Sequence, residues 1–159
     1  MKNYIGCKMV EAEPCFRVIQ RTGDGYTAKT KLIKAEELAS HYDGVEEGYK
    51  VRYEDGYESF SPKDVFEKAY MMVSDDNTIT KQNVDDFIKS VECTTIGEKT
   101  TLVRVTLVNG FELVEASSCV DAKNYDKKIG AKICMKKIKN KIWLLLGFFL
   151  QTAIGGVKP

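Results

Sequence analysis

The sequence predicts an α+β fold in which antiparallel hairpins pack against a long C-terminal helix, with a smaller β-rich module at the N-terminus. Two observations predict this class. The run TTLVRVTLV-NG-FELVEASS places Asn109-Gly110 between alternating segments, which is the strongest short-range hairpin signal. Apolar residues then recur at helical spacing from Ala131 to Phe149, as expected for one long amphipathic helix.

The N-terminal module spans residues 1–72. We expect strands on either side of Pro14, a glycine-rich turn at RTGDGY and a short helix over residues 34–41. A polar turn at DGVEEG precedes a hairpin that closes at Glu54-Asp55-Gly56. The pair Ser61-Pro62 then predicts a helix start, because Ser caps free amides and Pro fits the first turn. This helix is expected to end near Met72 and to bury Val65, Ala69 and Tyr70.

The segment SDDNT, residues 74–78, is expected to link this module to a second one over residues 79–155. Thr80 predicts the cap of a helix. Its core stripe would follow an i, i+3, i+4, i+7 spacing, namely Val84, Phe87, Ile88 and Val91. The acids around this segment do not fit a calcium loop, since glycine is missing at its sixth position and glutamate at its twelfth.

The Asn109-Gly110 turn sets the expected register of the hairpin. A two-residue loop with both turn residues at positive φ would pair Thr106 with Leu113 and Val105 with Val114. Both faces of such a hairpin are at least half apolar. We therefore expect the sheet to be covered on both sides.

The long helix is predicted to begin at a cap on Asp121 or Asn124 and to run through Lys141. Ile129 and Ile133 lie opposite its core face, which favours a second packing partner and hence a homo-oligomer, with a larger intramolecular core as the alternative. The apolar run IWLLLGFFLQTAI has 13 residues, too few to cross a membrane, so no membrane partner is expected. The expected core face comprises Ala131, Cys134, Met135, Ile138, Ile142, Leu145, Leu146 and Phe149.

The chemistry of the sequence argues against an enzyme. The single histidine, His41, has no nucleophile or second base near it in the sequence, and no phosphate-loop, zinc or nucleophile-elbow motif occurs. The five cysteines include no closely spaced pair and are expected to be reduced, mostly buried thiols. We therefore expect no catalytic residues, no metal and no cofactor.

Charge is distributed unevenly along the chain although the net charge is only +1. Residues 1–119 carry 21 acids and 15 bases, whereas residues 120–159 carry 2 acids and 9 bases. Two lysine stripes are expected on the long helix, one of Lys128, Lys132, Lys136 and Lys139 and the other of Lys123, Lys137 and Lys141. Such a segment attracts phosphate, nucleic acid or an acidic partner surface, and a solvated helix face is the simpler alternative.

The C-terminal half resembles a family of small tailed-phage proteins named for the coliphage gene products forty-nine and sixty-six. The matching elements over about residues 79–152 include the NGF turn at 109–111, Asn124-Tyr125-Asp126, Ile129-Gly130 and Lys141-Ile142-Trp143. The sequence departs from the family pattern where Cys134 and Ile138 replace alanine, and where lysine replaces arginine on the helix. The N-terminal half, with GYKVRYEDGY, resembles a module of phage and prophage proteins.

The resemblance implies a phage or prophage protein acting in the host cytoplasm. The family is similar to phage Thoeris anti-defence proteins, which bind cyclic ADP-ribose isomers and hold them without cleavage. This implies sequestration of a cyclic nucleotide-type immune signal, with nucleic acid or a host protein as the alternative partner of the lysine-rich helix. The residues expected to bind the ligand are Phe111, Asn124, Tyr125, Lys128, Lys132 and Lys136.

Overall fold

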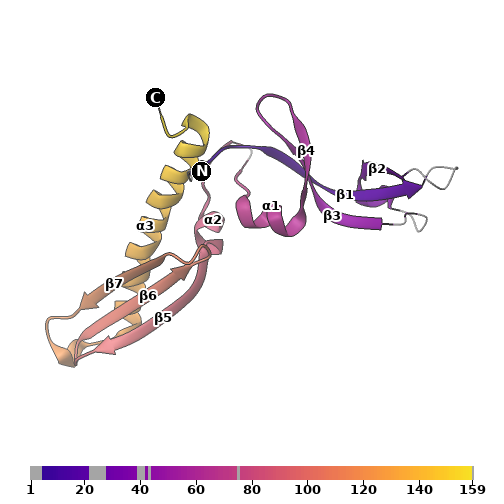
Figure 1. Cartoon of the computed structure of the whole chain (residues 1–159). Helices are drawn as coiled ribbons and strands as arrows, with labels where there is room; N and C mark the ends of the chain where they lie inside the picture. Colours follow the sequence, from indigo (N-terminus) through magenta and orange to yellow (C-terminus); the bar gives the residue numbers. More distant parts are fainter. Residues whose placement is uncertain (1–4, 22–27, 39–41, 43, 75, 159) are drawn as a thin grey trace. The chain divides into compact units, whose positions relative to one another are not determined.

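A computed structural model of the chain describes residues 5–21, 28–38, 42, 44–74 and 76–158. The expected α+β class is confirmed: the fold has two antiparallel sheets and a long C-terminal helix (Figure 1). The chain divides into two compact units, Met1–Met72 and Val73–Pro159. All of the expected RTGDGY turn except Arg21 lies outside the described residues, and so does His41.

The N-terminal unit is built on a four-stranded antiparallel sheet in the order β2-β1-β3-β4. Its small core consists of Cys15 and Val18 from β1, Ile33 from β2 and Val51 from β3. The short 3₁₀ helix η1 occupies part of the segment where a helix over 34–41 was expected. The elements are β1 (Glu11–Arg21), β2 (Ala28–Ile33), η1 (Ala35–Glu37), β3 (Gly44–Arg52), β4 (Glu58–Pro62) and α1 (Lys63–Ala69).

The expectation of two strands separated at Pro14 is wrong, because β1 runs through this residue without interruption. Pro14 pairs with Tyr49 of β3, while pairing with β2 begins only at Phe16. At Pro14 the strand therefore lies at the edge of the sheet, where a missing N–H costs no ladder hydrogen bond. The expected turn at DGVEEG is also wrong, since Gly44 opens β3.

The hairpin between β3 and β4 is confirmed: Tyr53 N donates to Tyr57 O at 2.9 Å, and Gly56 takes a φ of 81°. The expected Ser61 cap is wrong, because Ser61 is the last but one residue of β4 and α1 begins at Lys63. Helix α1 ends at Ala69 and exposes Val65. Phe66 packs inward instead, with its ring 4.2 Å from that of Tyr49 and 4.7 Å from that of Tyr70.

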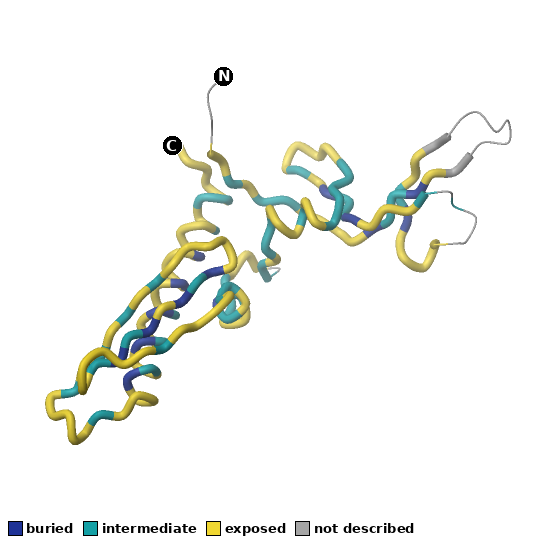
Figure 2. The backbone as a smooth tube through the Cα atoms, turned by 60° about the horizontal axis from the view of Figure 1, so that its bottom comes forward, coloured by how far each residue is buried: buried dark blue, intermediate teal, exposed yellow. Residues whose placement is uncertain are grey.

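The C-terminal unit consists of a three-stranded antiparallel sheet, β5-β6-β7, covered on one face by α3 (Figure 1). Alternate residues of β6 point toward the helix, and every fourth residue of α3 meets them, which gives the continuous buried core seen in Figure 2. The core residues are Val103, Val105 and Leu107 from β6 with Cys134, Ile138, Ile142 and Leu146 from α3. The elements are α2 (Lys81–Asp86), β5 (Ile88–Ile96), β6 (Thr100–Leu107), β7 (Glu112–Ser118), η2 (Ala122–Asn124) and α3 (Lys127–Gly155).

The second expected helix is confirmed at its start and wrong at its end. Thr80 caps α2 by accepting a hydrogen bond from Asn83 N at 3.2 Å, and Val84 is buried. The helix stops at Asp86, however, and the sequence IKSVECTTI forms β5, in which Val91 pairs with Val105. Its threonines and β-branched residues favour a strand, and pairing with β6 outweighs the continuing helical spacing.

The β6–β7 hairpin is confirmed, but its register is shifted by one residue. Val105 pairs with Leu113, and Arg104 pairs with Val114. Gly110 alone takes a positive φ, of 84°, and its N–H donates to Leu107 O, so the loop has three residues rather than two. This turn followed by a left-handed glycine is the common three-residue hairpin loop.

The one-residue shift exchanges the two faces of β7. Glu115 now points toward α3, whereas Val114 lies on the opposite face and is exposed. On that face Arg104 forms ion pairs with Glu92 at 2.7 Å and Glu112 at 3.7 Å. The expectation that both faces are covered is therefore wrong within this unit, because the second face is charged and solvated.

Helix α3 begins at Lys127 and is capped by Asp126, not by the expected Asp121 or Asn124. Asp126 Oδ1 accepts hydrogen bonds from Lys128 N at 2.7 Å and Ile129 N at 3.2 Å. Asp121 instead caps the short helix η2. The expected core face is confirmed at Cys134, Ile138, Ile142 and Leu146, half-buried at Ala131 and Met135, and wrong at Leu145 and Phe149, which are exposed.

No helix in the described part of the chain is long and apolar enough to cross a membrane.

Candidate functional site

An open concavity of about 600 Å³ lies between α2 and α3. Both helices belong to the C-terminal unit, and an ion pair between Lys139 of α3 and Asp85 of α2, at 2.6 Å, joins them. The volume is within the range of small-molecule sites, roughly 300–1,000 Å³. The concavity is lined by Lys81, Val84, Asp85, Lys132, Ile133, Lys136, Lys139, Asn140 and Trp143.

Lysine is the commonest residue around this concavity, although the surface that faces it is mostly apolar. Four of the lining residues are lysines and one, Asp85, is an acid. The hydrogen bond from Lys139 holds the pKa of the Asp85 carboxyl below its usual range, so Asp85 stays ionised and neutralises Lys139. Within the described residues, Lys132 and Lys136 form no ion pair, which leaves both ammonium groups available to an anion.

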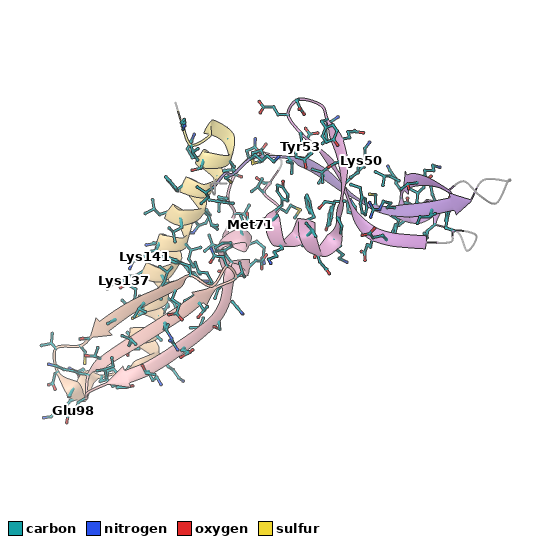
Figure 3. All side chains as sticks on the ribbon, viewed as in Figure 1. Lys50, Tyr53, Met71, Glu98, Lys137 and Lys141 are labelled. Carbon is teal, nitrogen blue, oxygen red and sulfur yellow. The ribbon has the colours of Figure 1, made fainter. Side chains whose placement is uncertain are left out.

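The lysines on the neighbouring side of α3 are engaged differently. Glu115 of β7 accepts from Lys141 at 2.5 Å and lies 3.8 Å from Lys137. The Glu115 side chain is only 16% exposed, and the hydrogen bond from Lys141 lowers the pKa of its carboxyl. Lys137 and Lys141, both labelled in Figure 3, therefore fasten α3 to the sheet. Lys137 and Lys141 thus have a structural role, whereas Lys132 and Lys136 are available to an anion.

Trp143 provides an aromatic surface in the same concavity. Its side chain is 41% exposed and lies seven residues, or two helical turns, beyond Lys136 on the same face. Val84, which is buried, and Ile133 supply apolar surface beside it. The sequence contained this signal, because Trp143 follows Lys132 and Lys136 at helical spacing, but it did not reveal that α2 contributes Lys81 and Asp85.

Asn124 and Tyr125 lie in a different place, at the end of η2 just before α3 begins. They line a second cavity of about 90 Å³, too small for a nucleotide. The Tyr125 hydroxyl is hydrogen-bonded to Thr95 Oγ1 at 2.8 Å and to Thr101 Oγ1 at 3.0 Å. Tyr125 therefore joins the start of α3 to β5 and β6, and its contacts are structural.

Phe111 lies at the opposite end of the hairpin from Tyr125. It follows the β6–β7 turn and is 54% exposed, while the far end of β7, at Ser118, reaches the cavity beside Tyr125. Seven residues of β-strand span roughly 23 Å. One small ligand cannot contact both ends, so the structure does not bring all the expected binding residues together. Lys132 and Lys136 share the concavity, and Lys128 lies one turn earlier on the same stripe.

The described residues contain no group of three or more His, Cys, Asp or Glu side chains that could hold a metal. Cys15 and Cys134 are buried and burial raises the pKa of both thiols, which makes them unreactive at neutral pH. The remaining three cysteines are half-buried. The expectation of a protein without catalytic residues stays a prediction.

These features define the C-terminal unit as a sheet-and-helix domain that presents a lysine-rich concavity with one tryptophan. Residues 79–154 match the family model described as Phage protein (N4 Gp49/phage Sf6 gene 66) family, which confirms the resemblance expected for this half of the chain. The match supports a phage protein and covers α2, the whole sheet and nearly all of α3. No curated protein and no solved structure matches the chain.

Proposed function

We propose that this phage-family protein binds a cyclic nucleotide-type immune signal, such as a cyclic ADP-ribose isomer or a cyclic oligonucleotide, in the α2–α3 concavity. The ligand is held without cleavage, in the cytoplasm of the host. The observation that carries the proposal is the position of Lys132, Lys136 and Trp143 around one space of about 600 Å³.

The lysines fit the phosphates of such a ligand. Lys132 and Lys136 are one turn apart, so their Cβ atoms are about 5–6 Å from each other and both side chains reach the same pair of phosphates. Lys81 approaches from α2. Lysine acts as a point charge and cannot bind a phosphate through two parallel hydrogen bonds, as an arginine guanidinium does. Several lysines are therefore needed to hold the phosphates.

Trp143 fits the base of the ligand. Stacking of a base on an aromatic side chain contributes about 1–3 kcal/mol. Asn140, one turn before Trp143 on the same face, adds an amide that can donate and accept hydrogen bonds at the edge of a base.

Retention without cleavage agrees with the chemistry of the lining. Asp85 is the carboxylate among the described lining residues, and its lowered pKa makes it a weak base at neutral pH. Lys139 also occupies its Oδ1 atom. A group in this position stabilises charge and does not activate water.

Calorimetry with cyclic ADP-ribose isomers and with cyclic di- and trinucleotides tests the proposal. We expect K132E/K136E to weaken binding at least 100-fold, because each charged contact contributes about 1.5–3 kcal/mol. The matched control is K89E/K123E, which makes the same charge change on two exposed lysines of this unit outside the concavity, and it should bind like the wild type.

Two further results test the details of the site. D85N removes the partner of Lys139 and should tighten binding, since it adds a free positive charge to the concavity. Chromatography after heat denaturation of the complex should recover the ligand intact. Recovery of cleaved ligand would contradict sequestration.

Nucleic acid is the second candidate ligand, favoured by the exposed stripe Lys128, Lys132 and Lys136, which spans about 12 Å along α3. A duplex or single strand bound there would show affinity that falls steeply with salt, with a slope set by the phosphates neutralised. Strong binding of a DNA or RNA duplex with no binding across the cyclic nucleotide panel would favour this candidate over the first.

A further inference from the structure

The C-terminal part of α3 exposes a large apolar surface, which is separate from the concavity and from the sheet. Leu144 is 74% exposed and Phe148 is 73% exposed, and both lie on the side of α3 opposite the buried Ile142 and Leu146. Ile154 is exposed as well. Figure 1 shows that α3 continues past the end of its own sheet, so this sheet does not cover the end of the helix.

We propose that a second copy of this chain packs against this surface, with the two α3 helices antiparallel and crossing at Gly147. The interface is isologous, so the same residues of both copies form it. This dimer goes beyond the proposed ligand binding and does not depend on it.

The size of the surface fits a dimer. Leu144, Phe148 and Ile154 lie within one side of α3 and together expose on the order of 400 Å² of apolar area per copy, within the range of functional patches. A stable interface buries about 800 Å² per partner, of which about 56–65% is apolar. Neighbouring polar residues such as Gln151 supply the remainder.

The charge pattern fits a second copy as the occupant. The segment from Ile142 to Val157 has no charged residue, whereas eight lysines lie between Lys123 and Lys141. An uncharged apolar surface is complementary to itself, and neither a phosphate ligand nor a nucleic acid finds a counterpart on it.

The same pattern selects the antiparallel direction. A parallel pair would place each lysine of α3 opposite the same lysine of the other copy, at a cost in electrostatic repulsion. An antiparallel pair crossing at Gly147 places Lys141 opposite Ala153 of the partner subunit, and the two lysine-rich halves then diverge.

Gly147 allows the close approach that this crossing needs. A Cβ atom added to Gly147 would meet nothing within 4 Å of it, so the space beside the helix is open. Without a side chain there, the two helix backbones can approach closely, and Leu144 and Phe148 of each copy can close over the crossing point.

Light scattering during gel filtration of the full chain tests the dimer. The wild type should have twice the mass of one chain, 17.9 kDa, and L144D/F148D should be a monomer with an unchanged circular dichroism spectrum. Both replaced residues are exposed, so the fold of a single copy does not depend on them. The control V65D/V120D makes the same change at exposed valines elsewhere and should stay dimeric.

Disulfide cross-linking tests the arrangement. Under mild oxidation G147C should cross-link to its own copy well above the wild-type level, whereas N140C should not, because the two Asn140 positions lie about 21 Å apart along the helices. A monomeric wild type, a dimeric L144D/F148D or cross-linking of N140C would each overturn the proposal.

Discussion

Replacing a helical glycine by alanine normally stabilises a helix, but at Gly130 we expect the replacement to destabilise the protein. It is buried in the first turn of α3, and a Cβ atom added there would approach Thr101 Cβ to 2.7 Å and would also collide with Thr101 Oγ1. Thr101 is fully buried and is held by the Tyr125 hydroxyl at 3.0 Å. The side chain therefore has little room to move.

The expected magnitude follows from three contributions. Alanine gains about 1 kcal/mol over glycine in a helix interior. Overpacking a buried contact costs about 1–3 kcal/mol, and displacing Thr101 from Tyr125 weakens a hydrogen bond of about 1 kcal/mol. Gly130→Ala should therefore lower the free energy of unfolding by about 1–3 kcal/mol, and the melting temperature by roughly 10 °C for a unit of this size.

Gly147→Ala is the matched control, because it makes the same substitution on the same helix where the added Cβ meets nothing within 4 Å. Both variants are made in an L144D/F148D background so that association does not contribute. The single tryptophan, Trp143, lies on α3, so its fluorescence during urea unfolding reports on the C-terminal unit. Gly147→Ala should gain up to about 1 kcal/mol. An equal gain for Gly130→Ala would refute the close approach of α3 to β6.

Three other substitutions test single features of the same unit. Glu115→Gln should destabilise the unit at neutral pH, and the difference should vanish in acid. The hydrogen bond from Lys141 lowers the folded-state pKa of Glu115 below the unfolded value of about 4.3. The stabilisation by the Glu115 carboxylate is therefore fully present above the unfolded pKa and is lost as the pH falls through the lower folded pKa. Tyr125→Phe should cost about 1–3 kcal/mol in urea unfolding, since it leaves the buried Thr101 hydroxyl without its partner. Gly110→Ala should cost about 1 kcal/mol, because alanine is strained at a φ of 84°; equal stability would contradict the three-residue loop.

The elements with strong local signals were predictable from the sequence. The Asn109-Gly110 turn located the β6–β7 hairpin, and the helical spacing located the core face of α3 at Cys134, Ile138 and Ile142. Thr80 marked the start of α2. In each case a few neighbouring residues carry the information, so no distant contact is needed to read it.

Sequence and structure disagree where tertiary contacts decide the local conformation. The apolar residues Ile88 and Val91 in the segment that forms β5 continue the helical spacing of α2. Pairing of this segment with β6 makes it a strand instead. The hairpin register depends on whether Asn109 takes a positive φ, and the loop with a single left-handed residue, Gly110, moved Glu115 to the helix side of the sheet.

The candidate site was predictable in part. The stripe containing Lys132 and Lys136 was visible as a helix face, and the structure places both residues in the concavity. The contribution of Lys81 and Asp85 depends on the packing of α2 against α3, which no local pattern encodes. The expected role of Phe111 followed from its nearness in sequence, but the length of β7 separates it from the start of α3.

Binding of a phosphate-bearing cyclic nucleotide in the α2–α3 concavity is the proposal on which the function of this protein depends. The most direct test is calorimetric titration of cyclic ADP-ribose isomers and cyclic dinucleotides into the wild type, K132E/K136E and K89E/K123E. We expect tight binding to the wild type and to K89E/K123E, and at least 100-fold weaker binding to K132E/K136E. Binding that is equal in all three proteins, or absent from the wild type across the panel, would contradict it.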